Sequence, residues 1–175
     1  MRKRRVPLRL FYSYCHSDSG LRNKLEEHLS LLHREGLIGQ WYDGKIGAGC
    51  EIDPAIDSNL ARSDVVLLLI SAAFLKSDYC WDREMSRALK RHHKGTARVI
   101  PIILRPVEHG WQQTVFGRLK ALPKDGKPVT KWANRDSAWA DVATGLREAI
   151  RELRGAPSAP SVRKVHRKGR KGGRR

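Results

Sequence analysis

The chain has 175 residues, of which 40% are hydrophobic and 30% are charged, and its formal net charge at pH 7 is +17. This length suits one domain with tails and is sufficient to bury a hydrophobic core. No apolar run approaches the roughly 18–20 residues of a membrane-spanning helix, and the N-terminus lacks the apolar stretch of a signal peptide, so we expect a cytoplasmic protein without a membrane span.

The positive charge is concentrated at the two ends of the chain. Four Lys or Arg residues lie within residues 2–5, and nine lie from Arg154 to Arg175, where there is no Asp or Glu. We therefore predict a basic arm over residues 1–7 and a disordered basic tail over residues 154–175. Such a tail either is simply solvated or binds nucleic acid or another anionic surface, and in one reading this binding is the main function of the protein.

The first half of the chain alternates strand-like and helix-like segments. Residues 8–14 are rich in apolar and aromatic residues and predict a first strand. Four leucines at helical spacing then predict an amphipathic helix that is capped by Asp18 or Ser19 and ends near residue 34. A second strand is expected over residues 37–42, followed by a glycine-rich loop over 43–49 and a short helix over 51–62.

The second half continues this alternation. Residues 65–70 form an unbroken apolar run that predicts a buried third strand, and a helix is expected over residues 81–93. Residues 98–104 predict a fourth strand, in which Pro101 indicates an edge or an irregularity because proline cannot donate to a strand ladder.

The last elements before the tail are shorter and less regular. A short fifth strand is expected over residues 129–132, and a last helix capped by Asp136 or Ser137 is expected to reach residue 153. Strands that alternate with helices predict a parallel sheet with helices on both faces, whose strand-to-helix loops all lie at one edge. Residues 13–18, 43–50 and 71–84 contain three such loops, and ligands of open α/β sheets bind at this edge.

Five short motifs, taken in order, resemble those of the Toll/interleukin-1 receptor (TIR) domain in its bacterial form. The family pattern of the last motif is Trp-Cys-x-x-Glu, whereas in this chain Cys80 precedes Trp81 and only Glu84 keeps its place. The motifs are Phe11-Tyr-Ser-Tyr14, Trp41-Tyr-Asp43, Gly49-Cys-Glu-Ile52 with Ile56, Ser71 with Phe74-Leu-Lys-Ser77, and Cys80-Trp-Asp-Arg-Glu84.

The resemblance covers residues 8–153 and implies one TIR domain with a flavodoxin-like, parallel five-stranded sheet of order 2-1-3-4-5. It also implies two functional branches. Enzymes of the family are NAD+ nucleosidases that cleave the nicotinamide–ribose bond, often in antiviral defence, and are activated when TIR domains assemble into an oligomer. Adaptors of the family act in signal transduction only by binding other TIR domains. In the enzymatic branch NAD+ is the substrate, and no cofactor is required.

Glu84 matches the catalytic glutamate of the family. Nicotinamide leaves as a neutral base, so the site needs no strong general acid but does need a carboxylate that stabilises the developing ribosyl cation. The alternative is an ordinary exposed carboxylate near a helix N-terminus, where the helix dipole favours it.

The resemblance and the strand-end loops also indicate six candidate substrate-binding residues, each with an ordinary alternative. The aromatic side chains either stack on a base or pack in the core, and the polar side chains either bind ribose and phosphate or belong to ordinary loops. The six residues are Tyr14, Cys15, His16, Asp43, Lys45 and Trp81.

Neither a metal site nor a disulfide framework is expected. The three cysteines, Cys15, Cys50 and Cys80, have no CxxC spacing, and the adjacent His92 and His93 point apart on a helix. Nothing in the neighbouring sequence activates Cys15 as a nucleophile.

Overall fold

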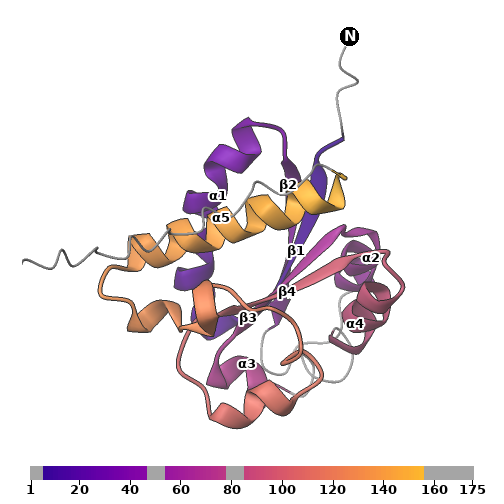
Figure 1. Cartoon of the computed structure of the whole chain (residues 1–175). Helices are drawn as coiled ribbons and strands as arrows, with labels where there is room; N and C mark the ends of the chain where they lie inside the picture. The colour runs from indigo at the N-terminus through magenta and orange to yellow at the C-terminus, as the bar shows by residue number, and fades with distance from the viewer. Residues whose placement is uncertain (1–5, 47–53, 78–84, 156–175) are drawn as a thin grey trace, which may run out of the picture.

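The protein, seen in a computed structural model that describes residues 6–46, 54–77 and 85–155, is built around a parallel sheet (Figure 1). The strand order is β2-β1-β3-β4, which confirms the predicted parallel sheet and the order of its first four strands. The strands are β1 (Leu8–Cys15), β2 (Ile38–Ile46), β3 (Val65–Ile70) and β4 (Arg98–Ile103).

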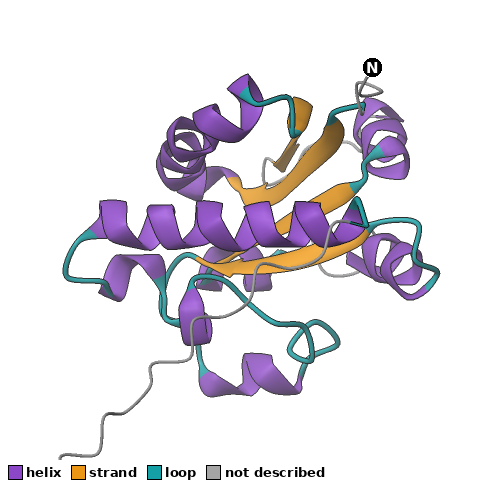
Figure 2. Ribbon diagram, turned by 45° about the horizontal axis from the view of Figure 1, so that its top comes forward, coloured by secondary structure: helices purple, strands orange, loops and turns teal. Residues whose placement is uncertain are grey.

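Helices cover both faces of the sheet, as expected for a doubly wound fold (Figure 2). One face packs against α1 (Ser19–Arg34) and α5 (Arg135–Leu153). The other face packs against α2 (Pro54–Arg62), α3 (Ala72–Lys76) and α4 (Met85–His93). Of these, the short helix α3 was not predicted, because its five residues are too few to show a helical period.

The pleat of β1 divides the core into two parts. Tyr12 and Tyr14 are fully buried on the side of α1 and α5, whereas Phe11 is fully buried on the opposite side. All six residues of β3 are buried, because this central strand is covered on both faces. The side chains of β1 alternate between the two faces, and β3 is an unbroken apolar run. Both patterns are consistent with a single sheet that is covered on both faces.

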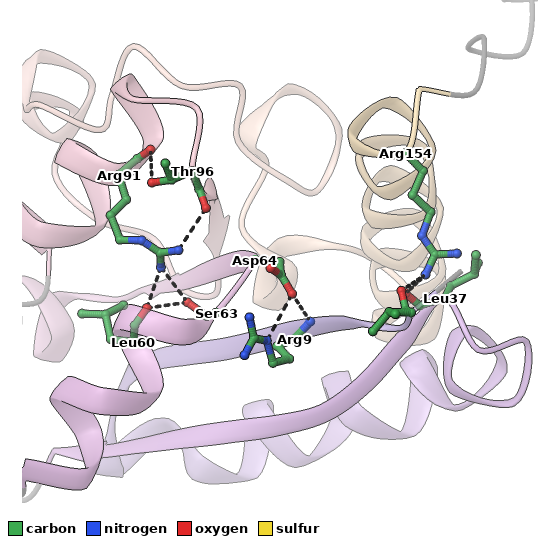
Figure 3. Close-up of polar contacts among 9 residues, drawn as sticks. Arg9, Leu37, Leu60, Ser63, Asp64, Arg91, Thr96 and Arg154 are labelled. Atoms are coloured by element: carbon green, nitrogen blue, oxygen red, sulfur yellow. Dashed lines mark hydrogen bonds and ion pairs between the residues drawn. The ribbon is translucent and has the colours of Figure 1, made fainter. Parts of the chain in front are cut away.

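The amino ends of the strands are tied together by three arginines (Figure 3). Each guanidinium donates to a carboxylate or to backbone carbonyls that belong to a different segment, so strand starts that are distant in sequence are held side by side. Arg9 donates to Asp64 through its Nε at 3.4 Å and also through its backbone N–H at 2.8 Å. Arg91 donates to the carbonyl oxygens of Leu60 at 2.6 Å and Thr96 at 2.9 Å, and Arg154 donates to that of Leu37 at 2.8 Å.

The predicted extents of the first and last long helices are confirmed, but not all of the predicted capping residues are. The three leucines Leu25, Leu29 and Leu32 are buried along α1, as the helical spacing predicted. Helix α5 begins one residue before the predicted Asp136, and the backbone N–H of Ser137 donates to the side chain of Asn134 at 3.1 Å. The prediction of Asp136 or Ser137 as the cap was therefore wrong, and Asn134, an equally good capping residue, occupies the position.

Strand β2 is longer than the sequence predicted. Residues 43–46 continue the strand instead of opening a glycine-rich loop, and the register pairs Tyr12 with Asp43 and Tyr14 with Lys45. The reason is that β1 offers backbone donors and acceptors as far as Cys15, and this pairing overrides the low strand propensity of Gly44. Residues 47–53 lie outside the described part of the chain.

The segment predicted as a fifth strand has a different conformation. Residues Val129–Lys131 form a 3-10 turn, and within the described residues the edge beyond β4 carries a single parallel bridge between Ile102 and Leu122. The backbone N–H of Leu122 donates to Pro101 at 2.9 Å, and that of Ile103 donates to Leu122 at 2.8 Å.

Pro101 explains why this bridge does not grow into a strand. The next pairing residue in a parallel ladder would be Lys120, whose carbonyl would need an N–H from Pro101, and proline has none. The preceding outward donor, the backbone N–H of Val99, is taken by Nδ1 of His92 at 3.1 Å. The prediction that Pro101 marks an edge is confirmed among the described residues, since β4 ends the sheet there.

The bond from Val99 to His92 predicts a pH-dependent contribution to stability. Burial lowers the pKa of His92 from its ordinary 6.5, and the charges of His93 and Arg98 lower it further, so the folded state favours the neutral ring. The contribution is present above pH 6.5 and is lost as the pH falls through the folded pKa. We expect urea unfolding to show a loss of about 1 kcal/mol between neutral and acidic pH, typical of one hydrogen bond, that is absent in His92→Gln. Equal pH dependence in both proteins would contradict this assignment.

Candidate functional site

The carboxyl ends of three neighbouring strands meet in a polar cluster of Asp18, Ser71 and Arg105, which we call the strand-end cluster. Asp18 lies in a 3-10 turn (His16–Asp18) directly after β1, Ser71 directly follows β3, and Arg105 lies two residues beyond β4. The Ser71 hydroxyl donates to one oxygen of the Asp18 carboxylate, and Arg105 Nε donates to the other at 2.7 Å. One carboxylate therefore joins three strand ends.

The cluster lies at the topological switch point of the sheet. From β1 the chain passes outward to β2 on one side, and the later strands β3 and β4 are added on the other side. In flavodoxin-like sheets ligands bind in the crevice beyond the carboxyl ends at this β1/β3 boundary. The bond between Asp18 and Ser71 spans that boundary and confirms that the loops after β1 and β3 converge as predicted. Strand β2, which pairs with β1 as far as Ile46, also ends at this edge.

Burial of the Asp18 carboxylate costs free energy, which its contacts within the cluster have to compensate. Asp18 is 2% exposed, whereas half of the Arg105 side chain is exposed to solvent. A buried carboxylate is stable only when its oxygens are hydrogen-bonded and its charge is compensated. Asp18 occupies the predicted N-cap position of α1 but makes no side-chain bond to that helix, because its oxygens are taken by Ser71 and Arg105.

Ser71 also begins the segment that leads to the Glu84 motif. Its hydroxyl accepts a hydrogen bond from the backbone N–H of Phe74 at 3.1 Å and so caps α3, and Phe74 is fully buried. Helix α4 begins at Met85, which is 1% exposed in the same core. Both flanks of the motif are thus anchored in the core, while the predicted residues Trp81 and Glu84 lie outside the described residues.

The remaining predicted residues fall into two groups. Tyr14 is fully buried, and the guanidinium of Arg22 lies 5.4 Å from the centre of its ring, so of the two alternatives the structure favours core packing. Cys15 is half-buried and its Sγ accepts a hydrogen bond from the Ser17 hydroxyl at 3.3 Å, and His16 is exposed beside Asp18. Cys15 and His16 therefore lie at the strand-end cluster.

The pairing register of β2 with β1 gives the positions of Asp43 and Lys45. Both belong to β2, in which Lys45 pairs with Tyr14 one residue before the strand ends at Ile46. This pairing places the Lys45 backbone at the same edge of the sheet as the strand-end cluster.

Arg105 is not among the residues predicted from the sequence. A polar residue just after a buried strand is the pattern that indicated the other strand-end residues, and the same pattern could have indicated Arg105. The sequence predicts an irregular segment from residue 105 onward, and the link of this segment to the first strand depends on a long side chain that crosses β3.

A groove of about 490 Å³ lies elsewhere, along the outer edge of β4. Val99 and Ile100 line it from the strand, Lys120 from the segment before the single bridge, and Glu148 and Glu152 from α5. It occupies the space that a continued fifth strand would fill, and it is separate from the strand-end cluster.

Across residues 6–46, 54–77 and 85–155, no three His, Cys, Asp or Glu residues are grouped so that they could hold a metal ion. None of the helices in that same part of the chain combines the length and the apolar character that crossing a membrane requires.

Comparison with known proteins agrees with the resemblance seen in the motifs. A model of the TIR-domain family matches residues 10–124. The uncharacterized protein y4lF of Sinorhizobium fredii is 50% identical over 154 residues, which are 88% of this chain and 47% of that protein. This chain therefore spans about half the length of that relative.

Two solved structures are similar to this chain at low sequence identity. The TIR domain of the Toll-related receptor TRR-2 from Hydra magnipapillata is 18% identical, with a TM-score of 0.49 over 83% of this chain and 97% of that one. The TIR domains of the activated Roq1 resistosome, which directly recognises the pathogen effector XopQ, are 18% identical, with a TM-score of 0.44 over 85% and 84% of the two chains.

The double role of Ser71 predicts a marked loss of stability when its hydroxyl is removed. Ser71→Ala takes the cap from α3 and one hydrogen bond from buried Asp18, so we expect the free energy of unfolding to fall by about 1–3 kcal/mol. Exposed Ser17, whose hydroxyl donates to Cys15 Sγ, is the control, and Ser17→Ala should change stability by less than about 0.5 kcal/mol. Urea unfolding measures both. Equal costs for the two variants would show that the strand-end cluster is not important for stability.

Proposed function

This chain is a member of the TIR-domain family, and we propose that it is a cytoplasmic NAD+ glycohydrolase that acts as an antiphage or stress effector. The proposed reaction cleaves the nicotinamide–ribose bond of NAD+ and releases nicotinamide with ADP-ribose or a cyclic variant of it. The observation that supports this best is the bond between Asp18 and Ser71, because it holds the start of the Glu84-bearing segment at the edge where flavodoxin-like sheets bind nucleotides.

In this proposal Glu84 acts as a lone carboxylate near the ribose. The glycosidic bond breaks with its electron pair leaving on the nicotinamide nitrogen, which carried the positive charge and so departs neutral. The ribosyl cation that remains is stabilised by the Glu84 carboxylate until water adds to it and releases a proton to solvent. An adenine nitrogen adding in place of water would give the cyclic product. No bound cofactor takes part, since NAD+ is the substrate.

The other residues of the proposed site bind and orient the substrate. Exposed His16 and the strand-end residue Lys45 are assigned to the phosphates, Asp43 to the ribose hydroxyls, and Trp81 to stacking on a base. Cys15, next to His16 at the end of β1, is assigned to contact with the substrate. Tyr14, which is fully buried, is assigned an indirect role in supporting the start of α1.

Activity of this kind has to be restrained, because unlimited loss of NAD+ is toxic to the cell. We propose that the enzyme is held inactive as a monomer and that association with other TIR domains completes the site. A high local concentration of the protein then serves as the activating signal.

A second candidate function is that of an adaptor that binds other TIR domains without catalysis. The observation that favours it is the interchange of Cys80 and Trp81 relative to the family motif, which changes the order of the residues that precede Glu84 in the sequence. Under this alternative the basic tail supplies binding to nucleic acid or another anionic surface.

Turnover of NAD+ by the purified, concentrated chain distinguishes the two functions. We expect wild-type protein to release nicotinamide and Glu84→Gln to be slower by a factor of about 10² to 10³ or more, as when one transition-state contact is removed. Asp82→Asn, a matched change two residues away, should retain most of the activity. Chromatography with mass spectrometry identifies the products.

Two outcomes would contradict the enzymatic proposal in different ways. If Glu84→Gln cleaves NAD+ as fast as wild type, Glu84 is not the catalytic group. If concentrated wild-type protein does not cleave NAD+ at all, the adaptor function is favoured.

The basic tail generates a separate prediction. It carries nine positive charges and no negative ones from Arg154 onward, so binding to duplex DNA should weaken steeply with salt, with a slope of about −0.9 per phosphate contacted. Removal of residues 155–175 should abolish this binding and leave NAD+ turnover unchanged. Fluorescence anisotropy at several salt concentrations measures it. Undiminished affinity in the truncated protein would exclude the tail as the binding element.

A further inference from the structure

The side chain of Arg105 lies across the carboxyl ends of three adjacent strands. It starts two residues after β4, passes the end of β3 and reaches Asp18 beyond β1, with 2.7 Å between Arg105 Nε and the carboxylate oxygen. A guanidinium therefore lies at the β1/β3 switch point, where a ligand of this sheet would bind.

One edge of this guanidinium binds the buried carboxylate of Asp18. Among the described residues Asp18 is the partner found for Arg105, and the bond uses Nε alone. The two terminal nitrogens carry four further N–H donors, and half of the side chain is exposed to solvent. The buried carboxylate thus fixes the orientation of a cation whose remaining donors are available to a ligand.

The charges of the ion pair are not equally accessible to solvent. Asp18 is 2% exposed, and one of its oxygens accepts the Ser71 hydroxyl, whereas Arg105 is on the solvent side. A ligand that approaches the sheet edge therefore meets the cation and not its counter-ion. Exposed His16, two residues before Asp18, adds ring nitrogens on the same turn.

We propose that Arg105 is a diphosphate-binding residue and that the strand-end cluster is the subsite for the pyrophosphate of a dinucleotide. A planar guanidinium presents parallel N–H donors that match two phosphate oxygens at once, which a compact ammonium group does not. The identification of the ligand as NAD+ rests on the function proposed above, whereas the anion site rests on the geometry of Asp18, Ser71 and Arg105. Arg105 is a binding residue and has no part in bond cleavage.

The test uses variants of the full chain that separate binding from folding. Arg105→Gln alone would leave Asp18 as an uncompensated buried charge and could unfold the protein. Arg105→Lys keeps a cation opposite Asp18, but its single ammonium cannot also present a bidentate pair to phosphate. The double variant Asp18→Asn with Arg105→Gln removes both charges together. Arg118→Gln, an exposed arginine on the groove at the β4 edge, is the matched control.

Calorimetric titration with inorganic pyrophosphate and with ADP-ribose measures the subsite without requiring catalysis. We expect both Arg105→Lys and the double variant to weaken binding of these ligands at least about tenfold, comparable to the loss of one charge-assisted hydrogen bond. Arg118→Gln should bind them like wild type. Where NAD+ is turned over, Arg105→Lys should raise KM for NAD+ and leave kcat and the KM for nicotinamide riboside, which has no phosphate, nearly unchanged.

Failure of this inference and failure of the proposed function are distinguishable. If Arg105→Lys binds pyrophosphate and ADP-ribose as tightly as wild type, or if wild type binds neither, the subsite is excluded. If binding depends on Arg105 but wild type does not cleave NAD+, the diphosphate subsite is supported and the enzymatic proposal fails. If NAD+ is cleaved with an unchanged KM in Arg105→Lys, the enzymatic proposal holds and the role of Arg105 is wrong.

Discussion

The Asp18 carboxylate is buried where β1 and β3 end, and both of its oxygens are hydrogen-bonded, one to Ser71 and the other to Arg105. Because an uncompensated charge at this depth would cost several kcal/mol, the three residues depend on one another and form one unit. That unit joins the residue before α1, the residue before α3 and the segment that follows β4. The architecture of the carboxyl edge, including the start of the segment that carries Glu84, therefore depends on one buried acid.

The two ends of the sheet are held by different means. At the amino ends, Arg91 and Arg154 donate to backbone carbonyls and Arg9 pairs with partly exposed Asp64, contacts that join segments without burying an acid (Figure 3). At the carboxyl ends the sheet buries a carboxylate and leaves its cationic partner half exposed. A fold that needed only stability could use the first arrangement at both ends. The costlier arrangement lies where α/β sheets bind ligands, and this asymmetry is the physical basis for regarding that edge as the functional one.

The sequence predicted the helices and strands that leave a local periodic pattern. It did not predict the features that depend on contacts between segments distant in the chain. Leucine spacing located α1, and the unbroken apolar run located β3, since burial on one face or on both leaves a direct pattern. The extension of β2 through Asp43 and Lys45 was missed, because it depends on how far β1 continues as its neighbour. The convergence of the strand-end loops followed from topology, yet the reach of Arg105 to Asp18 did not, because it depends on the path of the chain after β4 and on the length of one side chain. Tyr14 fits the family motif and the core equally well in sequence, and only its burial favours the core.

The edge of β4 also bears on the self-association that is proposed for this domain. Alternate residues of an edge strand point their backbone donors outward, and in β4 these positions are Val99, Pro101 and Ile103. The N–H of Val99 is bound by His92, Pro101 has none, and the N–H of Ile103 is bound by Leu122. Edge strands are commonly protected in such ways against the addition of another strand. Because β4 has no outward donor left to offer, the self-association proposed for activation has to use helical surfaces or the opposite edge at β2. The proline that interrupts the fifth strand thus also keeps this edge closed to a second chain.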